Sequence, residues 1–113
     1  MVDDNTDSAE SLALLLGLWH HEVKTAPDGP TALALAPQFR PDVVILDIGL
    51  PKMNGYDVAR ELRKLPGVAT ALLVALSGYG QEEDRKLSHE AGFAHHLMKP
   101  VDPDDLAAVL AGR

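Results

Sequence analysis

Hydrophobic and polar positions along the chain divide it into two kinds of segment. Residues 43–46 and 71–76 are short runs in which every position is apolar. Such runs are typical of strands that are buried on both faces of a parallel sheet. Two weaker strands are predicted at Glu22–Ala26, where polar and apolar residues alternate, and at Phe93–Met98.

The segments between these runs carry apolar residues at helical spacing. Helices are predicted over residues 7–21, 31–36, 56–65, 81–91 and 102–110. Asp7 and Glu10 have the spacing of a capping box at the start of the first helix, and Pro37 is expected to stop the second. The helix over residues 81–91 is charged and only weakly amphipathic, so we expect it to be loosely packed.

Strands and helices alternate with short connections throughout. This order predicts parallel strands, right-handed crossovers and helices on both faces of the sheet. No linker, repeat or low-complexity segment interrupts the 113 residues, which are therefore expected to form one domain over residues 1–113.

Composition and charge narrow the function. The chain has a net charge of −7 and no cluster of Lys or Arg, so it is not expected to bind nucleic acid directly. It has no cysteine for disulfides or thiolate metal sites, and no apolar stretch long enough for a membrane span. We expect a cytoplasmic domain that does not contact the membrane directly.

Polar side chains follow the predicted strands at the points where the apolar runs end. They are Asp3 and Asp4, Asp47, Ser77 and Lys99. Parallel strands share one carboxyl edge, so these residues are expected to lie together, where open α/β sheets bind ligands. Three crowded carboxylates repel one another unless a cation joins them, and Mg²⁺ with oxygen ligands fits best. Ser77 and Lys99 would complete a cradle for a phosphoryl group on Asp47.

In these motifs and their order the sequence resembles a response-regulator receiver domain of two-component signalling, the CheY-like family. The resemblance covers nearly the whole chain and implies a flavodoxin-like three-layer α/β/α fold with strand order 2-1-3-4-5. It also implies that Asp47 is the phosphoacceptor, that Asp3, Asp4, Asp47 and the Gly49 carbonyl hold Mg²⁺, and that Ser77 and Lys99 contact the phosphoryl group. The segments around Ser77 and Lys99 look most like receivers of hybrid histidine kinases.

The implied function is that of a phosphoacceptor in a phosphorelay. The donor would be a phosphohistidine on a sensor histidine kinase or a histidine phosphotransfer domain, and the chain would catalyse only its own phosphorylation and dephosphorylation. Phosphorylation is expected to draw Ser77 toward the phosphate and to shift the Ser77–Ala91 face.

Two other function classes remain open. One is a phosphorylation-deficient pseudo-receiver that acts as a protein-interaction module. The other is a phosphatase of the haloacid dehalogenase kind, whose pattern needs a second acid where this sequence has Gly49.

The sequence departs from the family at two places. Many receivers have Tyr or Phe as a switch residue three positions before the lysine, and here that position is His96. The first strand is also truncated, since only Met1 and Val2 precede the acidic pair. A slot is therefore expected between the strands that end at Ala26 and Leu46. The domain would then be either destabilised or completed by another chain, as in a swapped dimer.

Overall fold

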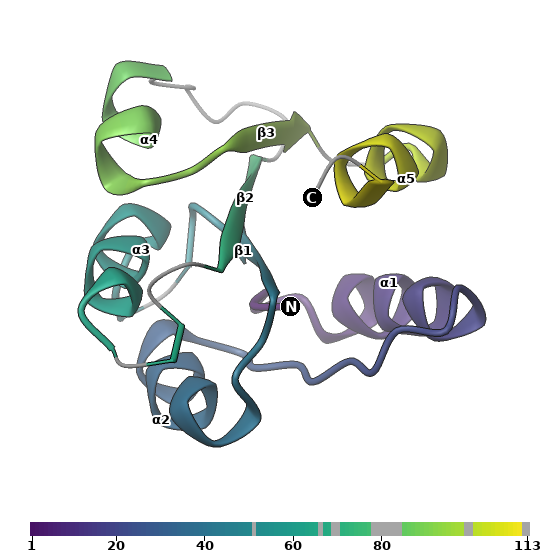
Figure 1. Cartoon of the computed structure of the whole chain (residues 1–113), viewed down its shortest axis with the longest axis horizontal. Helices are drawn as coiled ribbons and strands as arrows, with labels where there is room; N and C mark the ends of the chain where they lie inside the picture. Colours follow the sequence, from purple (N-terminus) through teal and green to yellow (C-terminus); the bar gives the residue numbers. More distant parts are fainter. Residues whose placement is uncertain (51, 66, 69–70, 78–84, 99–100, 112–113) are drawn as a thin grey trace.

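The computed structural model describes residues 1–50, 52–65, 67–68, 71–77, 85–98 and 101–111. Its elements, in chain order, are α1 (Thr6–Leu18), α2 (Gly29–Phe39), β1 (Val43–Asp47), α3 (Gly55–Arg63), β2 (Leu72–Ser77), α4 (Arg85–Ala91), β3 (His95–Met98) and α5 (Pro103–Ala111). Figure 1 shows α2, α3 and α4 on one side of the strands and α1 and α5 on the other. The predicted three-layer α/β/α architecture is confirmed.

The sheet is parallel in the order β1-β2-β3. The segment at Val2 adds a further strand position to this sheet, because Val2 forms parallel bridges to both Ala26 and Leu46. The order across the sheet is thus the segment at Ala26, the segment at Val2, then β1, β2 and β3. This is the predicted order 2-1-3-4-5 of flavodoxin-like folds.

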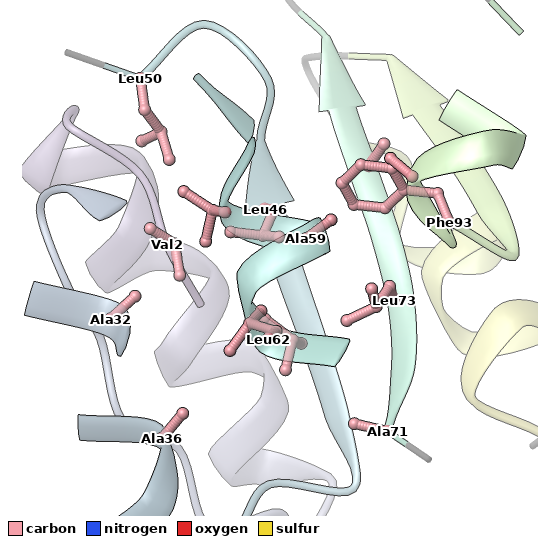
Figure 2. Close-up of a cluster of buried hydrophobic side chains, with 14 of the residues drawn as sticks. Val2, Ala32, Ala36, Leu46, Leu50, Ala59, Leu62, Ala71, Leu73 and Phe93 are labelled. Carbon is pink, nitrogen blue, oxygen red and sulfur yellow. The ribbon is translucent and has the colours of Figure 1, made fainter. Parts of the chain in front are cut away.

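Two apolar clusters fill the space between the sheet and its helices. On one face Leu46 and Leu73, both fully buried, pack with Leu62 of α3 and Ala36 of α2 (Figure 2). On the other face Ile45, Val74 and Leu76 pack with residues of α1 and α5. Side chains of a strand alternate between its faces, so the unbroken apolar runs of β1 and β2 serve both clusters.

Residues 1–3 lie in the sheet between the segment at Ala26 and β1. The Val2 N–H donates to the Ile45 carbonyl at 2.7 Å, and the Asp47 N–H donates to the Val2 carbonyl at 2.9 Å. On the other side the Ala26 N–H donates to the Met1 carbonyl at 2.9 Å, and the Asp3 N–H donates to the Ala26 carbonyl at 3.0 Å. Residues 1–3 therefore complete the sheet only at its carboxyl edge. Behind them lies a cavity of about 260 Å³, the predicted slot.

Several predicted boundaries were wrong. Helix α1 begins at Thr6, one residue before the expected cap, and ends at Leu18 because His20 adopts the left-handed conformation with φ 68°. Helix α2 runs past Pro37 to Phe39, although this proline has no N–H to donate; it is exposed and lies in the last turn, so only two residues of the helix follow it.

Other expectations are met in part. The predicted strand over residues 22–26 is reduced to the bridge at Ala26. The predicted helix over residues 81–91 is seen from Arg85, and its first residues lie outside the described part of the chain. Among the described residues, every helix is too short or too polar to span a lipid bilayer.

Candidate functional site

Three carboxylates meet at the carboxyl edge of the sheet. Asp47 is the last residue of β1, and Asp3 and Asp4 follow Val2 on the neighbouring segment. One oxygen from each of the three carboxylates lies within 4.8 Å of the others. Asp3 and Asp47 are buried and Asp4 is exposed, so the cluster opens to solvent on one side. The structure thus brings together the acidic residues that the sequence predicts.

Backbone hydrogen bonds fix the two buried carboxylates. The Gly49 N–H donates to Asp47 Oδ1 at 2.8 Å, and the Asn5 N–H donates to Asp3 Oδ1 at 2.9 Å. In each case the Asp side chain accepts from the N–H two residues later, and this forms a local turn of the kind that Asp favours. Both side chains are therefore held in place before any ligand binds.

Ser77 lies at the end of the next strand. It is the last residue of β2, is fully buried, and its Oγ is 3.0 Å from His96 Nε2. Asp47 pairs with Leu76 across the β1–β2 ladder, which places Ser77 one residue beyond the level of Asp47. The predicted hydroxyl is thus at the predicted edge, and His96 on β3 is in contact with it.

Three predicted features are not tested by these contacts. Lys99 lies outside the described residues, as do residues 78–84 of the predicted switch face. The Gly49 N–H donates to the Asp47 carboxylate. The expected role of the Gly49 carbonyl as a metal ligand stays a prediction.

Sequence reasoning missed one residue that shapes the site. Gly55 begins α3 directly behind β1, and a Cβ at this position would lie 2.8 Å from the Asp47 carbonyl oxygen and 2.7 Å from Ile48 Cα. Only glycine permits this approach of helix to strand. The Asn54-Gly55 pair reads simply as a turn, because the close approach depends on tertiary packing.

The donor set suits a hard divalent cation. Three carboxylates supply only oxygen ligands, which Mg²⁺ prefers, and the exposed side leaves room for water or a phosphate oxygen. Their mutual repulsion also favours a bound cation. By its chemistry the cluster fits the magnesium that the sequence predicts.

A doubly wound α/β sheet thus carries an acidic cluster and a buried hydroxyl at its carboxyl edge, the arrangement that the sequence predicts for a receiver domain. The family model for the response regulator receiver domain matches residues 1–111. The chain therefore belongs to the response regulator receiver domain family, whose members are phosphoacceptors of two-component signalling.

Individual relatives agree with this assignment. Response regulator PleD of Caulobacter vibrioides is 39% identical over 105 residues, which cover 90% of this chain and 22% of PleD. A putative response regulator from Chloroflexus aurantiacus has a TM-score of 0.89 and 32% identity, covering 98% of this chain and 91% of that chain. The receiver domain of sensor histidine kinase PA1611 from Pseudomonas aeruginosa has a TM-score of 0.86 and 27% identity, covering 98% and 91%. That structure holds a magnesium ion in its active site cleft.

Proposed function

We propose that Asp47 accepts a phosphoryl group from a phosphohistidine on a sensor histidine kinase or histidine phosphotransfer domain. The observation that carries this proposal is the convergence of Asp3, Asp4 and Asp47 within 4.8 Å, next to the strand that ends in the buried Ser77. No other cluster of three such acidic or metal-binding side chains is found among the described residues. Receivers interact with such kinases and phosphotransfer proteins as a family.

The chemistry follows from positioning and charge. A carboxylate oxygen of Asp47 attacks the phosphorus, a P–O bond forms, and the P–N bond to the donor imidazole breaks with the leaving nitrogen taking a proton. Mg²⁺ held by Asp3, Asp4, Asp47 and the Gly49 carbonyl would neutralise the charge that gathers on the phosphoryl oxygens. The Gly49 N–H keeps the Asp47 carboxylate oriented during the attack. Lys99 is proposed to pair with the phosphoryl group once it is bound.

Ser77 is proposed to carry the signal away from the site. Its hydroxyl would turn from His96 and donate to a phosphoryl oxygen, shifting the Ser77–Ala91 face. Hydrolysis of the acyl phosphate would return the chain to its first state. The chain would thus catalyse only its own phosphorylation and dephosphorylation, in the cytoplasm and without binding nucleic acid itself. Membership of a hybrid kinase and a dimer completed through the short first strand stay predictions.

The test is phosphorylation by acetyl phosphate with Mg²⁺, followed by intact-protein mass spectrometry. We expect one added phosphoryl group in the wild type and none in Asp47→Asn. Asp42→Asn is the matched control, because Asp42 directly precedes β1 and lies at the opposite edge of the sheet. It should be phosphorylated like the wild type.

The same assay separates the two other function classes. A pseudo-receiver would take no phosphoryl group in the wild type and would still bind its partner. A phosphatase would hydrolyse a phosphate ester with repeated turnover, whereas the proposed phosphoacceptor would not. Either result would contradict the role of Asp47 as a signalling phosphoacceptor.

A further inference from the structure

The loop between β1 and α3 carries Gly49, whose N–H orients the Asp47 carboxylate. The structure describes this loop at residues 48–50 and 52–54, and we call it the site loop. At its start the Ile48 carbonyl accepts from the first N–H of α3 at 3.1 Å, which fixes the loop on one side of Gly49. The position of Gly49 therefore also depends on what holds the loop on the other side.

Lys52 ties the second half of the site loop to the start of α2. Its ammonium donates to Asp28 Oδ2 at 3.2 Å, while Asp28 Oδ1 caps the helix by accepting from the Thr31 N–H at 2.8 Å. Hydrogen bonds from Thr31 and, to a smaller extent, the Lys52 ammonium hold the pKa of Asp28 below its ordinary value, which keeps this carboxylate charged. The Asp28 side chain is only 11% exposed, so solvent screens the ion pair less than it screens one between two exposed groups.

The next residue of the site loop packs on the same part of α2. A Cβ at Gly29 would lie 3.2 Å from Met53 Cβ and 2.6 Å from Val58 Cγ2, so the start of α2 lies close against both the loop and α3. The ion pair of Lys52 and the packing of Met53 thus fix the same short stretch. Loss of the ion pair alone is expected to loosen the loop without unfolding it.

Lys52 also has a backbone conformation that lysine rarely adopts. Its φ is 66°, in the left-handed region that glycine and asparagine tolerate best. Its side chain is 69% exposed, so the contribution of this residue comes from its ammonium rather than from packing. Lys52 therefore supplies the ion pair with Asp28 in spite of an unfavourable backbone conformation.

We propose that Lys52 is a positioning residue of the phosphoacceptor site. Its ion pair with Asp28 holds the site loop so that the Gly49 N–H stays on the Asp47 carboxylate. Without this ion pair the Gly49 peptide would move more freely, and with it the carbonyl that is predicted to bind Mg²⁺. Lys52 acts through Gly49 and not on the phosphoryl group. This inference rests on the proposed function of Asp47.

Lys52→Asn is the main test, because asparagine tolerates the left-handed φ and removes the charge. Its melting temperature should stay within about 2 °C of the wild type, since the relief of strain offsets the lost ion pair. Hydrogen exchange of the Gly49 amide, followed by NMR without Mg²⁺ or phosphodonor, should be roughly two- to fivefold faster, the change expected for one ion pair. Phosphorylation by acetyl phosphate with Mg²⁺ should be slower by a similar factor. Lys52→Arg keeps the charge and should restore both.

Asp28→Asn separates positioning from simple attraction of the phosphodonor. The amide oxygen of asparagine can still accept from the Thr31 N–H, so the cap of α2 remains. An anionic phosphodonor would be attracted less strongly after the loss of Lys52 and more strongly after the loss of Asp28, so attraction alone predicts opposite changes in rate. Positioning predicts slower phosphorylation in both variants and no further loss in the double variant.

Lys64→Asn is the matched control. Lys64 is 70% exposed and pairs with Glu61 at 3.2 Å, the same length as the ion pair of Lys52. It lies at the C-terminal end of α3, whereas the site loop precedes the first residue of this helix. The control should leave both the exchange of the Gly49 amide and the rate of phosphorylation unchanged.

Two results would overturn the proposal. One is exchange of the Gly49 amide that Lys52→Asn leaves unchanged. The other is faster phosphorylation of Asp28→Asn, which would reduce the role of Lys52 to attraction of the phosphodonor. A wild type that takes no phosphoryl group contradicts the phosphoacceptor function instead. The exchange measurement needs neither Mg²⁺ nor phosphodonor, so it still decides whether Lys52 holds Gly49 in place.

Discussion

His96 Nε2 lies 3.0 Å from Ser77 Oγ across the β2–β3 ladder, at the one hydroxyl that the proposed phosphoacceptor site uses. Ser77 is fully buried, so its hydroxyl has few alternative partners. A serine hydroxyl has a single proton to donate. In the tautomer whose Nε2 carries no proton, Ser77 donates this proton to His96, and His96 then competes with the phosphate for it.

A double-mutant cycle between Ser77→Ala and His96→Phe measures this contact. In the unphosphorylated protein we expect a coupling free energy of about 0.5–1.5 kcal/mol, the usual net value of one hydrogen bond. Urea unfolding followed by the fluorescence of Trp19, the single tryptophan, gives the four stabilities. With beryllium fluoride bound as a phosphoryl analogue, the coupling should fall toward zero because Ser77 then donates elsewhere. A coupling that is unchanged by the analogue would show that Ser77 stays with His96.

The acidic cluster should make stability depend on Mg²⁺. At a Mg²⁺ concentration ten times its dissociation constant, binding to the folded state alone stabilises by about 1.4 kcal/mol. Asp4→Asn should lose most of this gain, and without Mg²⁺ it should be more stable than the wild type because repulsion with Asp3 and Asp47 is relieved. Thermal unfolding with Mg²⁺ and with EDTA measures both effects. Glu10→Gln removes one exposed charge outside the cluster and should keep the full response to Mg²⁺.

Gly55 should be the least replaceable of the described glycines. In Gly55→Ala the new Cβ meets backbone atoms of Asp47 and Ile48 at 2.8 and 2.7 Å, so the strand end must shift. We expect a loss of about 1–3 kcal/mol, as for overpacking, together with slower phosphorylation of Asp47. Gly17→Ala is the matched control. Apart from the helix's own backbone, no atom of the described residues lies within 4 Å of a Cβ there, and a helix gains up to about 1 kcal/mol from the change. Equal effects of the two substitutions in urea unfolding would contradict the close approach at Gly55.

The sheet and the acidic cluster could be predicted from the sequence because they rest on strong local patterns. The four consecutive apolar residues 43–46 predict a buried strand, and Asp47 follows them directly. Once the strands are parallel, their carboxyl ends must meet, which brings Asp3, Asp4 and Asp47 together.

The features that could not be predicted depend on tertiary context. The helix continues past Pro37, which is exposed in the last turn, and the residue pattern alone does not reveal this. His96 was recognised as a departure from the family, but its contact with Ser77 depends on the register of β3 against β2. The predicted strand at residues 22–26 pairs with residues 1–3 only near Ala26. The alternation of polar and apolar residues therefore predicts a longer strand than the structure shows.

The buried amine of Met1 should make folding depend on pH. Burial lowers the pKa of this amine from 8.0 to about 6, whereas the unfolded chain keeps the ordinary value. Between these two values the unfolded state binds more protons than the folded state, so stability should rise as the pH increases from about 6 to 8. The gain is expected to be on the order of 1 kcal/mol, because Met1 is only partly buried. Chemical denaturation at several pH values measures it, with the N-terminally acetylated chain as control. Acetylation removes the titrating amine and leaves all histidines in place, so it should flatten this part of the pH profile. Identical profiles for the two chains would show that the Met1 amine titrates as if it were exposed to solvent.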